Sequence, residues 1–534
     1  MKRILSLKTW LVMIAALGLF TGGLRAARMP SRGRAKQALK RAVSFFRSEV
    51  ASHGGYVYKY SADLRLREAE GTPDEDTIWV QPPGTPLVGQ AFLDAYQVTG
   101  EKAYIEAARK AGMALVLGQL HSGGWSYSMS FDPEGRKRYS YRRSLDGELQ
   151  PSPTAAADRK SGAGWYTWKN RKYEGNKTVL DDDTTQAALR FLARLDRALE
   201  FEDEHIHDAA EYGLQSLLNS QYAVGAWSAN YDRFPEVSPD PERYPPLRAS
   251  YPEDWSRSWT KKFAGCYCNN DDVTVNSIAT MLYAWDTYDD ERYRRAAERA
   301  GEFFILAQMP EPQPAWAQQY NDRMQPVWDR AFEPPAVSGL ESQSILEALI
   351  MLARKTGELN YLAPVPRALD YLRRSKLADG RLSRFYELRT NRPLYFTRSR
   401  KRGHVPTYSD EDVADNYTFK LPSRLDAIEA EYRRVLAGDP SDYDLRPYWM
   451  PLERLTDGLL GARASEYDPE AEQEVTPELA RKVRKVIESQ DARGAWVEDG
   501  RLGHHGVKPE GGIITTRTFA QNVRTLCRFL AASR

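Results

Sequence analysis

Two acidic segments, each directly ahead of an apolar stretch with helical spacing, are the residues of this sequence best suited to chemistry. In the first, Asp181, Asp182 and Asp183 precede Thr184, and in the second, residues 269–276 read Asn-Asn-Asp-Asp-Val-Thr-Val-Asn. An Asp at a helix start can accept hydrogen bonds from free backbone N–H groups, and the helix dipole favours its charge. One carboxylate suffices for capping, so the pair of runs predicts oxygen ligands for a hard cation.

Two segments farther along the chain, residues 314–335 and 384–398, also bear side chains that could take part in chemistry. The candidates are Arg330, Arg384, Arg392 and Arg398. The alternative for Arg330 is a structural ion pair with Glu333 or Asp329. The alternative for Arg384 and Arg392 is a position on the surface or a role in tying loops together.

A repeated motif of the form Gln-x-x-x-Gly-x-Trp predicts the elements that position these residues. It begins at Gln119, Gln221 and Gln490, and a weaker copy runs from Gln308 to Trp316. Gly permits the left-handed turn that closes a helix, the Gln amide can satisfy exposed carbonyls, and the Trp packs back over the turn. A new helix start follows each copy after a loop of variable length. The pattern therefore predicts stacked helical hairpins.

We expect an all-α protein, an α/α toroid in which the hairpins form an incomplete or closed ring. The starts of its inner helices would share one rim, where the converging dipoles suit an anion. Long irregular loops rich in Tyr, Trp, Arg and Pro would form a cleft at this rim. These loops are residues 126–177, 228–263 and 389–422.

Composition and the N-terminal segment narrow the class of protein. The sequence is 42% hydrophobic, and its net charge of +2 argues against a nucleic-acid-binding surface over the whole molecule. Basic residues, an apolar run over residues 10–20 and small residues after it predict a signal peptide over residues 1–26. An uncleaved anchor is the alternative, but the apolar run is shorter than the roughly 20 residues of a spanning helix.

We therefore expect a single domain over residues 27–534, secreted or periplasmic, with no membrane contact after signal cleavage and no nucleic acid partner. We expect a monomer. The cysteines Cys266, Cys268 and Cys527 are too few for a disulfide scaffold. Their pairing is left open by the sequence.

The order of the segments resembles the pectate lyases of polysaccharide lyase family 10, over about residues 84–522. The resemblance rests on an acidic helix start before Arg-Phe-Leu-Ala, a Gln-x-x-x-Gly-x-Trp turn, and an Asn-Asp-Asp helix start. It continues with a Trp-containing run that holds Arg330, a Ser-Gly-Leu-Glu-Ser helix start, and Arg-Phe-Tyr-Glu with Asn-Arg-Pro. It implies an exported enzyme that cleaves polygalacturonate, or a related uronic-acid polymer, by Ca²⁺-assisted β-elimination.

The resemblance also implies roles for individual residues. It implies that Asp181 and one of Asp271 or Asp272 coordinate Ca²⁺, and that Arg330 is the base that removes the C5 proton of a galacturonate residue. Substrate-binding roles are implied for Arg384, Arg398, Arg392 and Asn270. Cation and arginines together would offset the charge that grows in the enolate-like transition state. The remaining acids of the first run, Asp182 and Asp183, are expected to act as cap and dipole partners.

Some residues depart from the family pattern, which has Asn at the position of Asp182 and Ala at the positions of Thr184 and Asp329. An Asp beside Arg330 favours the charged guanidinium and opposes a base role. Two other classes remain. A toroidal terpene cyclase would need the motif Asp-x-Asp-Asp-Thr, but this sequence has Leu180 where the motif requires its first Asp. A protein that binds acidic polysaccharide without cleaving it has no sequence feature against it.

Overall fold

The computed structural model describes residues 29–152, 175–232, 234, 247–259, 267–399, 403–414, 417–438 and 474–533. The predicted signal peptide and Cys266 lie outside these residues. Within them, none of the helices combines the length and the apolar character that crossing a membrane requires.

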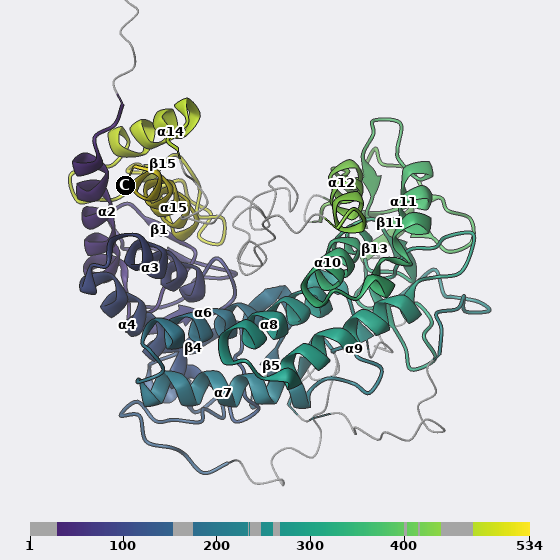
Figure 1. The fold of residues 1–534 in the computed structure, drawn as a ribbon, viewed down its shortest axis with the longest axis horizontal. Helices are drawn as coiled ribbons and strands as arrows, with labels where there is room; N and C mark the ends of the chain where they lie inside the picture. The colour runs from purple at the N-terminus through teal and green to yellow at the C-terminus, as the bar shows by residue number, and fades with distance from the viewer. Residues whose placement is uncertain are drawn as a thin grey trace, which may run out of the picture.

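The described helical hairpins stand side by side along an incomplete ring (Figure 1), which confirms the predicted α/α toroid. The inner helices are α3 (Thr85–Thr99), α6 (Thr184–Ala198), α8 (Val273–Tyr288) and α10 (Glu341–Thr356). Their outer partners are α4 (Lys102–Gly118), α7 (Glu204–Asn219), α9 (Glu291–Ala307) and α11 (Val365–Arg374), with the short helix η5 (Leu359–Leu362) before α11. Helix α12 (Leu425–Leu436) packs on α10 and α11.

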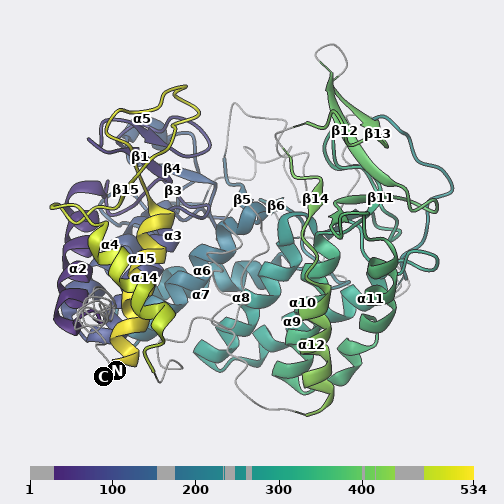
Figure 2. The ribbon, with the colours of Figure 1, turned by 90° about the horizontal axis from the view of Figure 1, so that it is seen from above.

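The other end of the ring combines the two ends of the chain. Helix α2 (Arg32–Phe45), with its wider turn η1 (Phe46–Val50), lies beside α14 (Pro477–Glu488) and α15 (Thr516–Ala532), and α15 also packs on α3. The ring of Phe46 stacks on Phe519 at a centroid distance of 3.7 Å. Figure 2 shows α2 and α14 on either side of this end of the ring, with α15 between them and α3.

Copies of the predicted turn motif follow α4, α7, α9 and α14 and join each of these helices to a neighbour. The Gln221 amide donates to Gly225 O and, across to helix α9, to Ala296 O, both at 2.8 Å. The Trp227 indole N–H donates to Leu217 O at 2.9 Å, which satisfies a carbonyl near the end of α7. The same bonds recur from Gln119 to Gly123 and Ala209, from Gln308 to Pro314 and Pro364, and from Gln490 to Gly494 and Ala38.

The glycine of this motif is needed for two separate reasons. Gly225 has a φ of +103°, a region that L side chains rarely adopt. A Cβ atom added there would lie 2.1 Å from the backbone oxygen of Arg299 in α9. The turn therefore approaches the next outer helix more closely than any other residue type allows.

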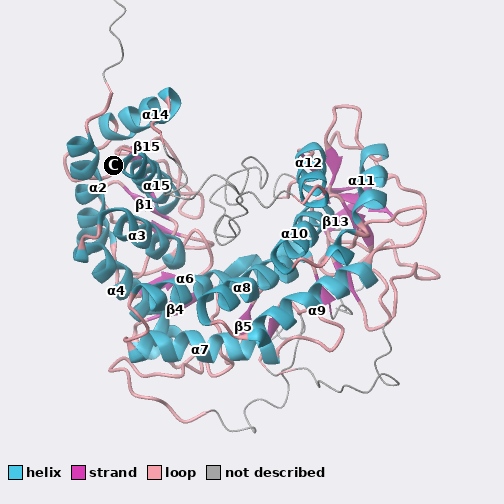
Figure 3. Cartoon of the chain, in the orientation of Figure 1, coloured by secondary structure: helices cyan, strands magenta, loops and turns pink. Residues whose placement is uncertain are grey.

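Short antiparallel sheets cover the end of the ring at which the inner helices begin (Figures 2 and 3). Two sheets have four strands, β15 (Val497–Glu498), β16 (Ile513–Thr515), β1 (Lys59–Ser61) and β2 (Arg67–Glu68) in one, and β13 (Gly403–Thr407), β12 (Pro393–Ser399), β11 (Phe385–Glu387) and β9 (Ala336–Ser338) in the other. The two-stranded pairs are β3 (Thr77–Trp79) with β4 (Ser128–Ser130), β5 (Thr178–Val179) with β6 (Asn230–Tyr231), β7 (Tyr267–Cys268) with β8 (Gln319–Tyr320), and β10 (Leu382–Ser383) with β14 (Lys420–Leu421). The register of β7 and β8 pairs Tyr267 with Tyr320. The strands that lead into the inner helices place those helix starts at one rim, as predicted.

Half-buried or buried acids anchor the described parts of the long loops. Asp208 on α7 accepts a bidentate pair of hydrogen bonds from Arg142 at 2.6 and 2.8 Å, and a third from Arg143 at 2.6 Å. Arg142 and Arg143 lie in the segment after the short helix α5 (Pro133–Arg136). Glu387 in β11 forms an ion pair with Arg257. The segment predicted as a loop over residues 389–422 contains the β12–β13 hairpin, so this part of the expectation was wrong.

Candidate functional site

Two turns with the same backbone conformation precede helices α6 and α8. In η3 (Asp181–Asp183), Asp182 and Asp183 have φ values of +52° and +60°, and in η4 (Asn270–Asp272), Asp271 and Asp272 have +48° and +60°. Left-handed backbone at two consecutive residues other than Gly is costly and is often found at functional sites. Asp182 and Asp271 thus occupy equivalent positions in two neighbouring repeats.

The carboxylates of Asp181, Asp182 and Asp271 converge at these turns. One ligand oxygen from each lies within 4.8 Å of the others. Asp181 is 1% exposed, and its Oδ2 accepts a hydrogen bond from the Tyr127 hydroxyl at 2.8 Å. Its Oδ1 is buried and has no hydrogen-bond partner among the residues that the structure describes. Burial, and then the neighbouring Asp carboxylates, raise the pKa of both Asp181 and Asp182 above its ordinary value.

The other acids of the two runs point elsewhere. Asp183 forms an ion pair with the buried guanidinium of Arg190 at 2.5 Å, and Asp272 accepts a hydrogen bond from the Ser344 hydroxyl at 3.1 Å. Neither α6 nor α8 has a side-chain cap hydrogen bond at its start. The structure thus groups Asp182, which we expected to cap the helix, with Asp181 and Asp271, whereas Asp272 lies outside that group.

Asn270 and Gln81 hold two of the three carboxylates in place. Asn270 is fully buried, its Nδ2 donates to Asp271 Oδ2 at 3.0 Å, and its Oδ1 accepts from the Gln318 amide at 2.8 Å. The Gln81 amide donates to Asp182 Oδ2 at 2.9 Å. These contacts support a positioning role for Asn270 and leave its predicted contact with substrate untested.

Arg330 contacts the acidic group and is itself held by a carboxylate. Its Nε and Nη2 donate to the two oxygens of Glu333 at 2.7 and 2.6 Å, and Nη2 lies 3.3 Å from Asp271 Oδ2. Burial alone would lower the pKa of the Arg330 guanidinium, but Glu333 outweighs it, so the pKa lies above its ordinary value. The arrangement contains the ion pair with Glu333 that was the structural alternative for this residue.

Arg384 lies on the other side of Asp271 and is 4% exposed. Its Nη2 lies 3.5 Å from both Asp271 Oδ1 and the fully buried Glu341 Oε1, and its guanidinium carbon lies 4.1 Å from the centre of the Tyr417 ring. Burial lowers the pKa of Arg384, and the opposing effects of Tyr417 and Glu341 raise it to a net value above the ordinary one. The Nε atom of Arg384 is buried without a hydrogen-bond partner among the described residues.

The remaining predicted arginines are not brought into this group. Arg392 is exposed, and its guanidinium carbon lies 3.5 Å from the centre of the Tyr408 ring. Arg398 lies in β12 opposite His404, and its side chain is outside the described part of the structure. Their predicted roles in binding substrate stay predictions.

The sequence analysis did not predict several residues of the site, namely Gln81, Tyr127, Gln318 and Glu341. It also did not predict that the Asp182 carboxylate lies with those of Asp181 and Asp271. Glu341 belongs to the Ser-Gly-Leu-Glu-Ser segment that was noted for another reason, so a signal existed for it. Gln81 and Tyr127 lie 101 and 54 residues before their aspartate partners, and no spacing rule connects them.

Carboxylates outnumber guanidinium groups at this site. Glu333 and Glu341 each face an arginine, and in the described part of the chain the three aspartates have no guanidinium contacts within 4 Å besides the two long ones to Asp271. An excess of buried carboxylate oxygens, one of them without a partner, is the environment that a hard divalent cation fits. The residues present therefore fit a cation such as Ca²⁺.

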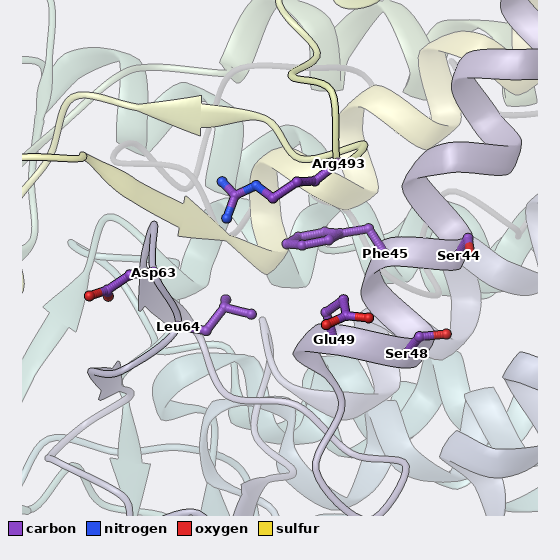
Figure 4. A pocket seen from close by; sticks show the side chains of 7 residues that line it. All are labelled: Ser44, Phe45, Ser48, Glu49, Asp63, Leu64 and Arg493. Atoms are coloured by element: carbon purple, nitrogen blue, oxygen red, sulfur yellow. The ribbon is translucent and has the colours of Figure 1, made fainter.

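Two other features of the described structure, a buried cysteine and a hollow, are not part of this group of side chains. Cys268 is buried and free, and its Sγ accepts from the Gln319 amide at 3.0 Å. A separate hollow of about 580 Å³ lies between η1, the β1–β2 turn and the turn before β15 (Figure 4). Its lining consists of Ser44, Phe45, Ser48, Glu49, Asp63, Leu64 and Arg493, and none of the predicted site residues is among them.

No protein-family profile and no curated protein sequence match the chain. Similar solved structures include a family 10 polysaccharide lyase from Cellvibrio cellulosa, with 15% identity and a TM-score of 0.40, covering 65% of this chain and 97% of the lyase. A mutant of a family 10 lyase from the same organism, in complex with trigalacturonic acid, has 15% identity and a TM-score of 0.38, covering 66% and 98%. A D-mannose isomerase has 12% identity and a TM-score of 0.41, covering 94% and 98%.

Proposed function

We propose that this protein is a polysaccharide lyase that cleaves polygalacturonate or a related uronic-acid polymer by cation-assisted β-elimination. The observation that carries the proposal is the environment of Asp271. Its carboxylate joins Asp181 and Asp182 in a group of possible cation ligands and contacts the guanidinium groups of Arg330 and Arg384. A cation and two arginines side by side suit a substrate that carries carboxylates.

In this proposal the aspartates hold Ca²⁺, which when bound neutralises a uronate carboxylate and so makes the neighbouring C5 proton more acidic. The buried Arg384, oriented by Glu341 and Asp271, binds a carboxylate of the substrate. In the elimination the C5–H bond breaks, its electron pair forms the C4–C5 double bond, and the C4–O4 bond breaks. The proton from C5 passes to the base, and the departing O4 takes up a proton from water.

Arg330 is the proposed catalytic residue at C5. A protonated guanidinium cannot accept the C5 proton, so its assignment as the base requires that it first pass a proton to Glu333. Without that transfer, Arg330 acts as a fixed positive charge that stabilises the enolate-like transition state, and water accepts the C5 proton. The same ion pair favours a second candidate, a protein that binds acidic polysaccharide without cleaving it.

The expected product identifies the reaction directly. We expect unsaturated uronides, which absorb in the ultraviolet, to accumulate from polygalacturonate, and a chelator to abolish their release. Replacing Arg330 with Ala should lower the rate by about 10²–10³-fold, as the loss of a positioned charge does in other enzymes. Arg367→Ala, which removes an exposed arginine paired with Glu311, is the matched control and should leave the rate unchanged.

A polymer-binding assay separates the two candidate functions. Normal binding of polygalacturonate by both the wild type and Arg330→Ala, with no product from any uronan, would refute the lyase and support the binding protein. Action outside the cytoplasm and a monomeric state are part of the proposal, and analysis of the exported protein by sedimentation would test the latter.

A further inference from the structure

Asp182 is the least expected member of the acidic group. It follows Asp181 in the chain, yet the left-handed turn directs both carboxylates into the same group as Asp271. We propose that Asp181, Asp182 and Asp271 form a complete site for a hard divalent cation, so that Ca²⁺ binds before any polysaccharide arrives. This inference rests on the cation role in the proposed function and adds that the substrate is not needed to build the site.

The buried Asp181 supplies an observation that is independent of the clustering. The side chain is 1% exposed, and Tyr127 satisfies only one of its two oxygens. The second oxygen is buried without a hydrogen-bond partner in the described part of the chain. A buried carboxylate oxygen without a partner costs free energy, and a cation ligated by it removes that cost.

Asp182 is held in position without being neutralised. The Gln81 amide donates to its Oδ2 at 2.9 Å, and Gln81 is fixed in turn by the Trp79 indole N–H at 3.0 Å. Gln81 also donates to the exposed Glu70 at 3.1 Å, so a further negative charge lies nearby. No ion pair reaches Asp181 or Asp182 among the described residues, since Arg330 and Arg384 both approach Asp271.

The number of carboxylates decides whether the site needs the substrate. The affinity of an oxygen site for Ca²⁺ rises with the charge and rigidity of its ligands. With two aspartates, a carboxylate from the polymer would have to supply the missing charge. With three aspartates, the protein supplies that charge itself. Two of them, Asp182 and Asp271, occupy equivalent turns of neighbouring repeats.

Titration of the chelator-treated full-length protein with CaCl₂ alone, followed by calorimetry, tests the inference. We expect the wild type to bind without polysaccharide and Asp182→Asn, which keeps the shape but removes the charge, to bind at least tenfold more weakly. Glu70→Gln is the matched control, because it removes a charge from the same hydrogen-bonded chain outside the ligand group. It should change the dissociation constant by less than about threefold.

Thermal unfolding supplies a second measurement on the same variants. Ca²⁺ should raise the melting temperature of the wild type and of Glu70→Gln by more than that of Asp182→Asn, because ligands stabilise the state that binds them. Without Ca²⁺, Asp182→Asn should melt no lower than the wild type, since it relieves repulsion. Equal Ca²⁺ affinity for the wild type and Asp182→Asn, or binding only after oligogalacturonate is added, would overturn the inference.

The outcomes keep this inference distinct from the lyase proposal. Ca²⁺ binding without cleavage of any uronan would refute the lyase and leave the site intact. Cleavage with Ca²⁺ binding only in the presence of the polymer would support the lyase and refute the preformed site.

Discussion

Replacing Gly225 with Ala measures how far the stability of the ring depends on the contact between one turn and the next outer helix. The variant meets two costs. A residue with a side chain at a φ of +103° loses roughly 1–2 kcal/mol. The added methyl group would lie 2.1 Å from the backbone oxygen of Arg299, and such overpacking costs roughly 1–3 kcal/mol.

The matched control is Gly357→Ala at the end of α10. Its φ of +80° carries the same kind of strain, but a Cβ there has nothing within 4 Å. We therefore expect Gly225→Ala to be destabilised by about 2–5 kcal/mol and Gly357→Ala by about 1–2 kcal/mol. The difference between them isolates the contact with α9.

Urea unfolding followed by circular dichroism at 222 nm is the assay, and the midpoints and slopes of the two variants are compared with those of the wild type. A single transition in each protein allows the comparison in free energy. Equal midpoints for the two variants would refute the reasoning, because the clash with Arg299 would then contribute nothing. A lower midpoint for Gly357→Ala would refute it as well.

Three further predictions follow from contacts at the site and in the loops. Arg384→Ala should lower kcat/KM on polygalacturonate at least tenfold while calorimetry finds Ca²⁺ affinity changed less than threefold, because in the proposed function the guanidinium binds substrate rather than the cation. Glu387→Gln removes the charge that pairs with Arg257, so limited proteolysis between residues 247 and 259 should become faster while helix content stays the same. Burial raises the pKa of Asp208. The hydrogen bonds from Arg142 and Arg143 lower it by more, so the net pKa lies below the ordinary 3.8. Stability from this group is therefore present above pH 3.8 and is lost as the pH falls through the lower, folded-state pKa, so Asp208→Asn should lower the melting temperature at pH 7 and lose that effect in acid.

The hairpins were predictable because the turn motif acts locally. The Gln221 amide reaches a carbonyl only four residues away, and the glycine and tryptophan follow at fixed spacing. The second bond of the same amide joins residues 75 apart in the chain. The sequence therefore indicates that hairpins form but contains no local pattern for how neighbouring outer helices are joined.

At the site, residue type was more predictable than direction. Asp181 and Asp271 were both singled out, but Asp182 was expected to cap a helix because Asp is common at that position. Two successive left-handed residues reverse the chain just before each helix, and this conformation is rare for residues other than Gly. A rule based on propensity could not anticipate this conformation, so Asp182 was left out of the predicted ligands and Asp272 was kept as an alternative to Asp271.

The role of Arg330 shows a different limit. Its pairing with Glu333 spans only three residues and was recognised as an alternative. Its contact with Asp271 spans 59 residues and depends on the arrangement of two repeats. Local spacing therefore indicates the ion pair with Glu333, whereas the contact with Asp271 is visible only in the folded chain.

The packing of α15 on α2 and α3 has a consequence for the order in which the protein can fold during synthesis. A ribosome makes the chain from the N-terminus, and inner helix α3 must wait for a partner whose last residue is Ala532. The hairpins from α6 to α9 can associate as they emerge, because their neighbours follow directly in the chain. The first hairpin to leave the ribosome is therefore among the last to be fully buried, and it is the part of the nascent chain most in need of protection by chaperones.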